Sequence, residues 1–291
     1  MKDVTIVIPI RNRAAYLMRL FRTLAAVSYE DLEIILVDNG STDNSLSLCR
    51  SFAEDAPMVV TVLEESRTGA PIARNRGLEA CKTEWIYFFD SDDEISSSFL
   101  TEIMPQVCDE DMVVFPTTQE VDGKRRRRGF VSSTSPAGQI LSATMSTQSM
   151  LFRTDFIRSI GGWDERVNVW QDWELGIRAL LHQPKILWLP DKAYHLIHIH
   201  AQSITGASMT ERLEARLQTI DIVAQEITTP TDRCALYLRH SILNGMLQRE
   251  GTAPVKPNLP ASLLTRLLGA CLQRYTALGG RGSWRLALFF L

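Results

Sequence analysis

The sequence has little that would support a disulfide framework, a zinc centre or a membrane span. Its five cysteines are odd in number, widely spaced and without any CxxC pair, so neither disulfides nor zinc is indicated. No apolar run approaches the roughly 20 residues of a membrane helix, and the amino-terminal run is too short for a signal-peptide core. A formal charge of -3 excludes the basic excess typical of nucleic-acid binding. We therefore expect a protein of the reducing cytoplasm.

The amino-terminal third alternates predicted strands with predicted helices. With 45% hydrophobic residues over 291 positions, the chain can bury the core of one large domain, with or without an appendage. The apolar patterns predict strands at 4–8, 32–37, 59–63 and 85–89, separated by helices at 14–24, 44–53 and 69–81. This alternation predicts a Rossmann-like half with a parallel sheet.

The remaining two thirds follow a different rhythm. We expect a helix at 96–107, a hairpin over 117–131 that turns near Asp122 and Gly123, and strands at 112–115, 149–152, 186–189 and 193–199. The basic run 124–128 at the turn is either a solvated loop tip or a contact for an anionic group. Helices are expected at 171–181, 211–227, 232–249 and 263–278.

A cluster of acidic residues follows the fourth strand directly. Asp90, Ser91, Asp92 and Asp93 come after five apolar or aromatic residues, which is typical of a strand buried on both faces. Ligands of open α/β sheets bind outside the carboxyl ends of the strands. Neighbouring carboxylates raise one another's pKa unless a cation compensates them. The cluster therefore predicts a divalent metal at this edge.

Three more stretches lie at the ends of predicted elements: 9–12 after the first strand, 38–43 after the second and 73–77 before the fourth. With the acidic cluster, in this order, they resemble the family 2 glycosyltransferases of the GT-A fold over residues 1–205. The resemblance implies a mixed, mostly parallel α/β sheet flanked by helices. It also implies an inverting enzyme that moves a sugar from a nucleotide donor to a hydroxyl group.

The resemblance gives the acidic cluster a role. Asp90, Ser91 and Asp92 match the family's DxD motif, which holds the donor diphosphate through Mn²⁺ or Mg²⁺. It implies that Asp92 is the main metal ligand and that Asp90 also faces the ribose or uracil. Asp93 either extends the cluster or caps the following helix.

Asp38 matches the family aspartate that accepts a hydrogen bond from uracil N3–H, although a turn residue is the alternative. The other nucleotide-sugar contacts implied by the resemblance are Pro9, Ile10, Arg11, Gly69, Arg74 and Ser91. Arg74 is alternatively a structural partner of the acidic cluster. Asn39 stands where a second Asp is more usual and Arg11 where an aromatic residue is common, so UDP is the expected nucleotide without being fixed.

Asp172 matches the family's catalytic base, a carboxylate at a helix start that removes the proton of the acceptor hydroxyl. The family has Glu where this chain has Gln171, and a helix cap is the alternative role of Asp172. Glu174 is expected to be structural. His200 matches a histidine that completes the metal shell in some members, with a surface histidine as the alternative, and the role of His198 is left open.

The resemblance also divides the chain into a GT-A domain at 1–205 and a helical appendage at 206–291. Within the domain, residues 1–95 form the nucleotide-binding half and 96–205 the acceptor half. Residues 251–291 contain five basic and no acidic residues, which fits either packing, including a homodimer, or contact with the inner face of the plasma membrane. The expected acceptor is a cell-envelope glycan or lipid-linked sugar. A non-catalytic sugar-nucleotide binding protein is the alternative.

Overall fold

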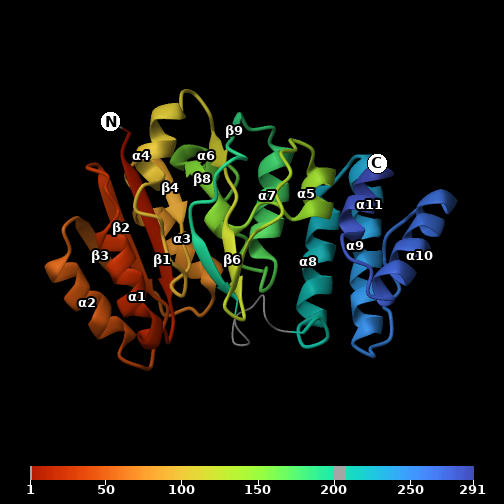
Figure 1. Ribbon diagram of the computed structural model, residues 1–291, viewed down its shortest axis with the longest axis horizontal. Helices are drawn as coiled ribbons and strands as arrows, with labels where there is room; N and C mark the ends of the chain where they lie inside the picture. The colour runs from red at the N-terminus through yellow and green to blue at the C-terminus, as the bar shows by residue number, and fades with distance from the viewer. Residues whose placement is uncertain (1, 200–207) are drawn as a thin grey trace. The chain divides into compact units, whose positions relative to one another are not determined.

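The computed structural model describes residues 2–199 and 208–291 (Figure 1). The chain divides into two compact units. The first contains Met1–Phe130, Met145–Arg166 and Pro184–His200, and the second contains Val131–Thr144, Val167–Gln183 and Ala201–Leu291. The second unit therefore combines the carboxyl-terminal helices with two segments that precede residue 205, the boundary expected between domain and appendage.

A seven-stranded sheet in the order β3-β2-β1-β4-β8-β5-β9 forms the centre of the described first unit. Its strands are β1 (Val4–Ile10), β2 (Leu32–Asp38), β3 (Val59–Glu64), β4 (Trp85–Phe88), β5 (Met112–Val114), β8 (Met150–Arg153) and β9 (Ile186–Trp188). All neighbours pair in parallel except β8, which runs antiparallel between β4 and β5. The predicted mixed, mostly parallel α/β sheet is confirmed.

Helices cover both faces of this sheet. They are α1 (Ala14–Ala25), α2 (Ser45–Asp55), α3 (Ala70–Ala80), α4 (Phe99–Ile103) and α6 (Thr154–Ser159), with short 3₁₀ turns at Met104–Gln106 and Thr147–Ser149. Successive side chains of β1 alternate between the faces. Ile6 and Ile8 pack with the apolar face of α1, whereas Val7 faces α3. A Cβ on Gly77 of α3 would lie 2.2 Å from the Val7 side chain, so this glycine permits the close approach of helix and strand.

A smaller sheet in the order β10-β6-β7 contains the predicted hairpin. It is built from β6 (Thr118–Val121), β7 (Lys124–Arg127) and β10 (Leu196–Ile199). Asp122 and Gly123 both have positive φ, as a two-residue type I′ turn requires. The basic run therefore forms the exposed edge strand β7 and not the loop tip, and charged side chains on such an edge disfavour pairing with another strand.

The second unit is helical. Its helices are α5 (Pro136–Ser142), α7 (Gln171–Leu181), α8 (Leu213–Glu226), α9 (Pro230–Arg249), α10 (Leu263–Ala277) and α11 (Ser283–Phe289). Its core joins apolar side chains of α5, α7, α8 and α9. The helices predicted at 211–227, 232–249 and 263–278 are confirmed as α8, α9 and α10, while α5 and α11 were not predicted. Within residues 2–199 and 208–291, no helix is long and apolar enough to cross a bilayer.

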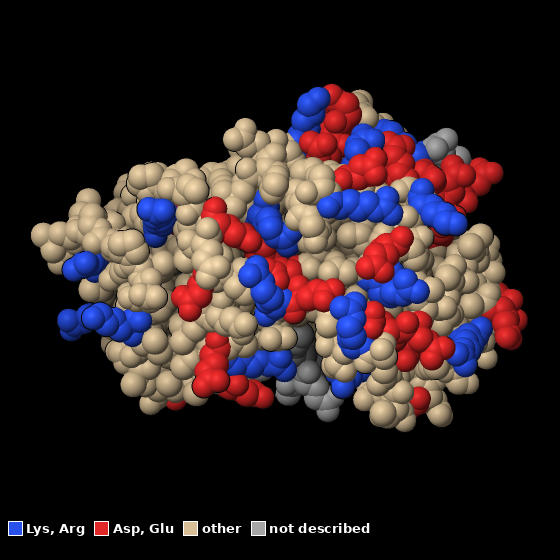
Figure 2. Space-filling view, turned by 180° about the vertical axis from the view of Figure 1, so that it is seen from behind, with Lys and Arg blue, Asp and Glu red and all other residues tan. Residues whose placement is uncertain are grey.

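Acidic and basic side chains are mixed over most of the face in Figure 2, in keeping with the small formal charge. At the left end of that view, basic side chains lie on a surface formed otherwise by uncharged residues.

Candidate functional site

The acidic cluster lies at the carboxyl ends of three parallel strands. β1 ends at Ile10, which is in register with Asp38 at the end of β2. β4 lies on the other side of β1, and the Phe89 N–H donates to the carbonyl of Val7 at 3.0 Å. Because parallel strands end at the same edge, the fold brings Ile10, Asp38 and the cluster together.

Asp90 is held by two donors. Its Oδ1 accepts a hydrogen bond from the Arg74 guanidinium at 2.6 Å, and its Oδ2 accepts one from Gln148 Nε2 at 2.7 Å. Arg74 is buried, and its guanidinium lies 4.4 Å from the ring centre of Trp163. Arg74 is therefore placed as a partner of the acidic cluster, one of the two roles considered from the sequence.

Asp93 is buried and fully engaged. Its Oδ1 accepts from the backbone N–H of His198 at 2.8 Å, and its Oδ2 accepts from Gln148 at 2.6 Å. Burial, followed by the charges of Asp90 and Asp92, raises the pKa of Asp93 well above its ordinary value. The alternative that Asp93 caps the next helix is wrong, since α4 begins at Phe99 after Ser98.

Gln148 was not predicted from the sequence. Its side-chain amide nitrogen donates to both Asp90 and Asp93, and its backbone carbonyl accepts from the Tyr87 hydroxyl at 2.7 Å. Gln148 lies in the turn before β8, and β8 runs antiparallel to β4. The residues before β8 therefore meet those after β4. Gln148 belongs to no recognisable sequence motif. Only the antiparallel direction of β8 could therefore have indicated that it meets the acidic cluster.

Asp92 lies among basic side chains of the chain's first helix region. Its Oδ2 is 3.8 Å from an Arg13 guanidinium nitrogen, and Arg19 donates to its backbone carbonyl. The Asp92 side chain is 15% exposed and that of Asp90 is 32% exposed. Both carboxylates therefore reach the surface, unlike Asp93. Hard oxygen donors of this kind fit Mg²⁺ or Mn²⁺.

Asp38 is the acidic residue of this edge whose hydrogen bonding is incomplete. Its Oδ2 accepts from the Ser41 N–H at 3.1 Å, whereas its buried Oδ1 accepts no hydrogen bond from any described residue. A buried acceptor without a donor is costly. Pro9 is half-buried, Ile10 is buried and Arg11 is exposed beside it in sequence. The arrangement can accept one further N–H donor.

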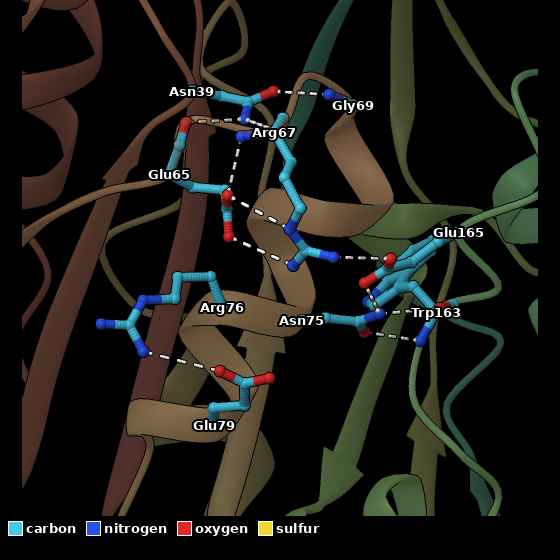
Figure 3. Close-up of polar contacts among 9 residues, drawn as sticks. All are labelled: Asn39, Glu65, Arg67, Gly69, Asn75, Arg76, Glu79, Trp163 and Glu165. Atoms are coloured by element: carbon cyan, nitrogen blue, oxygen red, sulfur yellow. Dashed lines mark hydrogen bonds and ion pairs between the residues drawn. The ribbon is translucent and has the colours of Figure 1, made fainter.

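Asn39 fastens a loop, and Figure 3 shows how. Its amide group donates to the carbonyls of Glu65 and Arg67 at 3.2 and 2.6 Å, and its Oδ1 accepts from the Gly69 N–H at 2.8 Å. A carboxylate cannot donate, so Asp could not make the first two bonds. The departure from the more usual Asp therefore has a structural reason. Asn39 also fixes Gly69, the residue directly before α3, which has a φ of 150°.

The same loop and helix α3 are tied to residues Trp163 and Glu165 (Figure 3). Arg67 forms ion pairs with Glu65 and with Glu165, at 3.2 and 3.1 Å. The side chain of Asn75 on α3 donates to the Trp163 carbonyl and accepts from its N–H, both at 2.8 Å. The two hydrogen bonds from Asn75 therefore position Trp163, over which the Arg74 guanidinium lies.

Asp172 lies in the first turn of α7, in the second unit. Its Oδ1 accepts from the Trp173 N–H at 2.9 Å. Trp170, just before the helix, has a φ of 57°, a left-handed conformation that is strained for a bulky residue. Glu174 is buried in an ion pair with Arg178 at 2.6 Å. It therefore contributes to structure.

Of the histidines at positions 195, 198 and 200, the first two lie within the described residues and differ in their surroundings. His195 is buried among aromatic rings and accepts from the Ser96 N–H through Nδ1, and burial lowers its pKa to about 3. His198 Nε2 lies 2.8 Å from Glu94 and its Nδ1 3.4 Å from Glu120. It borders an open hollow of about 260 Å³ that Arg19 and Tyr16 also line. His200, the expected metal ligand, lies outside the described residues.

The chain is similar to known proteins in sequence and in fold. The family model described as "Glycosyl transferase family 2" matches residues 5–163, more than half of the chain. The minor teichoic acid biosynthesis protein GgaA of Bacillus subtilis is 28% identical over 186 residues, which cover 58% of this chain and 41% of GgaA. Matches to three other curated relatives cover 36% or less of each relative's length.

Two solved structures share the fold. Staphylococcus aureus TarS in complex with UDP-GlcNAc has a TM-score of 0.68 and 18% identity, covering 98% of this chain and 90% of that one. The mannosyltransferase PcManGT of Pyrobaculum calidifontis, in complex with GDP-Man and Mn²⁺, has a TM-score of 0.64 and 17% identity, covering 98% and 84%. At these identities the likeness shows the fold alone.

Proposed function

The chain belongs to glycosyl transferase family 2, and we propose that it is an inverting, metal-dependent glycosyltransferase with a UDP-sugar donor. The observation that carries this proposal is the meeting of two features at one sheet edge. Arg74 and Gln148 hold Asp90 of the acidic cluster, and the buried Oδ1 of Asp38 accepts no hydrogen bond from any described residue. One feature suits a diphosphate with its cation and the other a nucleobase. Together they match the diphosphate and the base of a nucleotide-sugar.

Asp92 and Asp90 are the proposed metal ligands, with His200 as a further one. Each oxygen of Asp90 accepts one hydrogen bond and keeps a second lone pair. When bound, Mn²⁺ or Mg²⁺ would neutralise the charge that develops on the departing diphosphate. Ser91 lies between the two ligands. Arg74 and Gln148 hold Asp90 in place, so the cluster is ordered before the donor arrives.

Asp38 is proposed to accept the base N–H through Oδ1. Uracil N3–H fits this role, and guanine N1–H offers a donor of the same kind. The related folds bind both classes, since TarS was solved with UDP-GlcNAc and PcManGT with GDP-Man. Pro9, Ile10, Arg11 and Gly69 would line the nucleoside. UDP remains the proposed nucleotide, and a ligand panel distinguishes the two.

Asp172 is proposed as the general base. The acceptor oxygen attacks the anomeric carbon, the bond from that carbon to the phosphate oxygen breaks, and the hydroxyl proton passes to the Asp172 carboxylate. The nucleoside diphosphate leaves on the opposite face, so the configuration inverts. A non-catalytic sugar-nucleotide binding protein is the second candidate, and it would have no need of Asp172.

The acceptor is proposed to be a glycan or lipid-linked sugar of the cell envelope, which the likeness to GgaA favours. We keep the proposal that residues 1–95 bind the nucleotide, that 96–205 meet the acceptor and that 206–291 form an appendage. The proposed site of action is the inner face of the plasma membrane. A homodimer through the last helices is the alternative to membrane contact.

A thermal-shift panel of UDP, GDP and their sugars, with and without Mn²⁺, tests the donor side. We expect UDP to raise the melting temperature only when Mn²⁺ is present, because a ligand that binds the folded state alone stabilises it. Stabilisation by UDP that survives chelation would contradict the metal role. Stabilisation by GDP alone would replace the proposed nucleotide.

Asp172→Asn tests catalysis separately. Release of UDP from the best donor of the panel, with water or an added glycan as acceptor, should fall roughly 10²- to 10⁴-fold, the usual contribution of a general base. Binding of UDP with Mn²⁺ should stay within about twofold of the parent, a shift of under half a kcal/mol. Asp155→Asn is the matched control, since Asp155 also lies in a first helical turn and is 93% exposed. Undiminished release in Asp172→Asn would refute the base assignment.

A further inference from the structure

Helix α10 buries its small side chains. The residues that face the second unit are Thr265, Gly269, Leu272 and Thr276. A Cβ on Gly269 would lie 2.6 Å from the Ser241 Oγ of α9, and one on Gly245 of α9 would lie 2.5 Å from a backbone carbonyl of α10. The two helices therefore approach so closely at Gly245 and Gly269 that a Cβ would not fit at either position.

The large apolar side chains of α10 point the other way. Leu264, Leu267 and Leu278 are 66%, 58% and 81% exposed, and Leu263 is 75% exposed. Leu264, Leu267 and Leu278, which directly follows α10, are spaced by three and eleven residues, and this spacing places them on one stripe opposite the buried face. Leu272 lies on the opposite side of α10 and is buried.

The end of the chain repeats this arrangement. In α11 the buried residues are Ser283 and Ala287, whereas Phe289 and Phe290 beyond them are exposed. Exposed single apolar residues are ordinary. Two successive helices that direct small residues inward and Leu or Phe outward form an apolar surface that needs an occupant.

Charge indicates which occupant. Residues 251–291 carry five basic side chains and no acidic one. Arg266 and Arg274 belong to α10 itself, and Arg285 to α11. The left end of the view in Figure 2 shows blue side chains on a tan surface, where the rest of the view mixes blue and red.

We propose that the outer face of α10, continued by the end of α11, docks on an anionic lipid bilayer. Apolar side chains would enter the acyl boundary, while the arginines would extend to the phosphates of the headgroups. A second copy of the chain is a poorer occupant, because a twofold interface would bring two faces of the same charge together. This inference rests on the membrane contact put forward in the proposed function and deepens it, and the vesicle experiment tests it without any measurement of catalysis.

Flotation of the full chain with vesicles tests the proposal. We expect binding to vesicles of 70% phosphatidylcholine and 30% phosphatidylglycerol, and little binding to phosphatidylcholine alone. Each basic residue near the surface contributes roughly fivefold to binding, so Arg266→Gln with Arg274→Gln should weaken it roughly 20-fold. The triple variant Leu264→Ser, Leu267→Ser and Leu278→Ser should weaken it roughly 100-fold or more, because buried apolar area drives insertion.

Met18→Ser with Val59→Ser is the matched control. Both side chains are exposed apolar residues of the first unit, at 61% and 62%, and their loss should leave vesicle binding unchanged. Circular dichroism should show every variant folded. The proposal is overturned if the triple variant floats like the parent or if binding ignores phosphatidylglycerol. It is also overturned if the parent shows, by sedimentation, a dimer that the triple variant loses while neither binds vesicles.

Discussion

Two regions of the molecule depart from the usual distribution of residues in opposite directions. At the carboxyl edge of the sheet, charge is buried: Asp93 is 2% exposed, and its two oxygens are held by Gln148 and the backbone of His198. In α10, Leu263, Leu264 and Leu267 are exposed, whereas the small residues Thr265, Gly269 and Thr276 are buried. Burying a charge and exposing a large apolar side chain both cost free energy.

The difference lies in what would remove each cost. Buried carboxylates are relieved by donors and by a cation, so the acidic edge is suited to a charged small ligand. An apolar face with a basic margin is relieved by a surface that is apolar inside and anionic outside. The two regions therefore indicate two different partners, and each can be perturbed without touching the other.

The largest effect is expected from Asp92→Asn. It removes one proposed metal ligand, so the stabilisation by UDP with Mn²⁺ should be lost, together with at least about 100-fold of donor turnover. Without ligand the variant should be as stable as the parent within about 1 kcal/mol, because a like charge beside Asp90 and Asp93 is removed. A thermal-shift assay measures stability and its increase with UDP, and an assay of UDP release measures donor turnover. Unchanged UDP stabilisation would separate the cluster from ligand binding.

Gln148→Leu should have the next largest effect, this time on stability. It leaves Asp90 and buried Asp93 each with one hydrogen bond fewer, which should lower the free energy of unfolding by about 3 kcal/mol. Gln106→Leu is the control, since Gln106 is exposed and bonds only locally to the Glu102 carbonyl. Urea unfolding at pH 7 compares them. Equal losses in both variants would show that Gln148 does not hold the cluster.

Buried His195 should make the free energy of unfolding depend on pH. Its pKa is about 3 in the folded chain against about 6.5 unfolded, so below pH 6.5 the unfolded chain binds a proton that the folded chain does not. Stability from this site is therefore full above pH 6.5 and falls by about 2 kcal/mol between pH 8 and pH 5. His195→Asn keeps an acceptor for the Ser96 N–H and should flatten this fall. Urea unfolding at both pH values measures it, and an equally steep fall in the variant would contradict the assignment.

The smallest effect should come from the outer face of α10. Leu264→Ser and Leu267→Ser should each change the free energy of unfolding by under about 0.5 kcal/mol, whereas Leu272→Ala on the buried face should cost about 2–5 kcal/mol. Urea unfolding in the absence of lipid gives both values. A large loss at Leu264 or Leu267 would mean that the chain itself covers this face, and the contrast between the two regions would disappear.

Much of the fold was predictable because it depends on local patterns. Runs of apolar and aromatic residues predicted β1, β2 and β4, and helical periodicity predicted α1 and α7 nearly to the residue. Short elements were less accessible. The seven-residue helices α5 and α11 have too few turns for periodicity to distinguish them, and the expected helix at 96–107 proved to be α4 followed by a 3₁₀ turn.

The acidic cluster Asp90-Ser91-Asp92-Asp93 shows where the limit lies. The sequence by itself determined that carboxylates follow a buried strand, that Asp38 directly follows another predicted strand and that residues 251–291 are basic and apolar. Only the tertiary structure decided that Arg74 and Gln148 hold Asp90, that Asn39 fastens the 65–69 loop and that α10 turns its leucines outward. The reason is physical: a motif is a property of neighbours along the chain, whereas donor, acceptor and packing partners are chosen by strand direction and by how closely two helices approach.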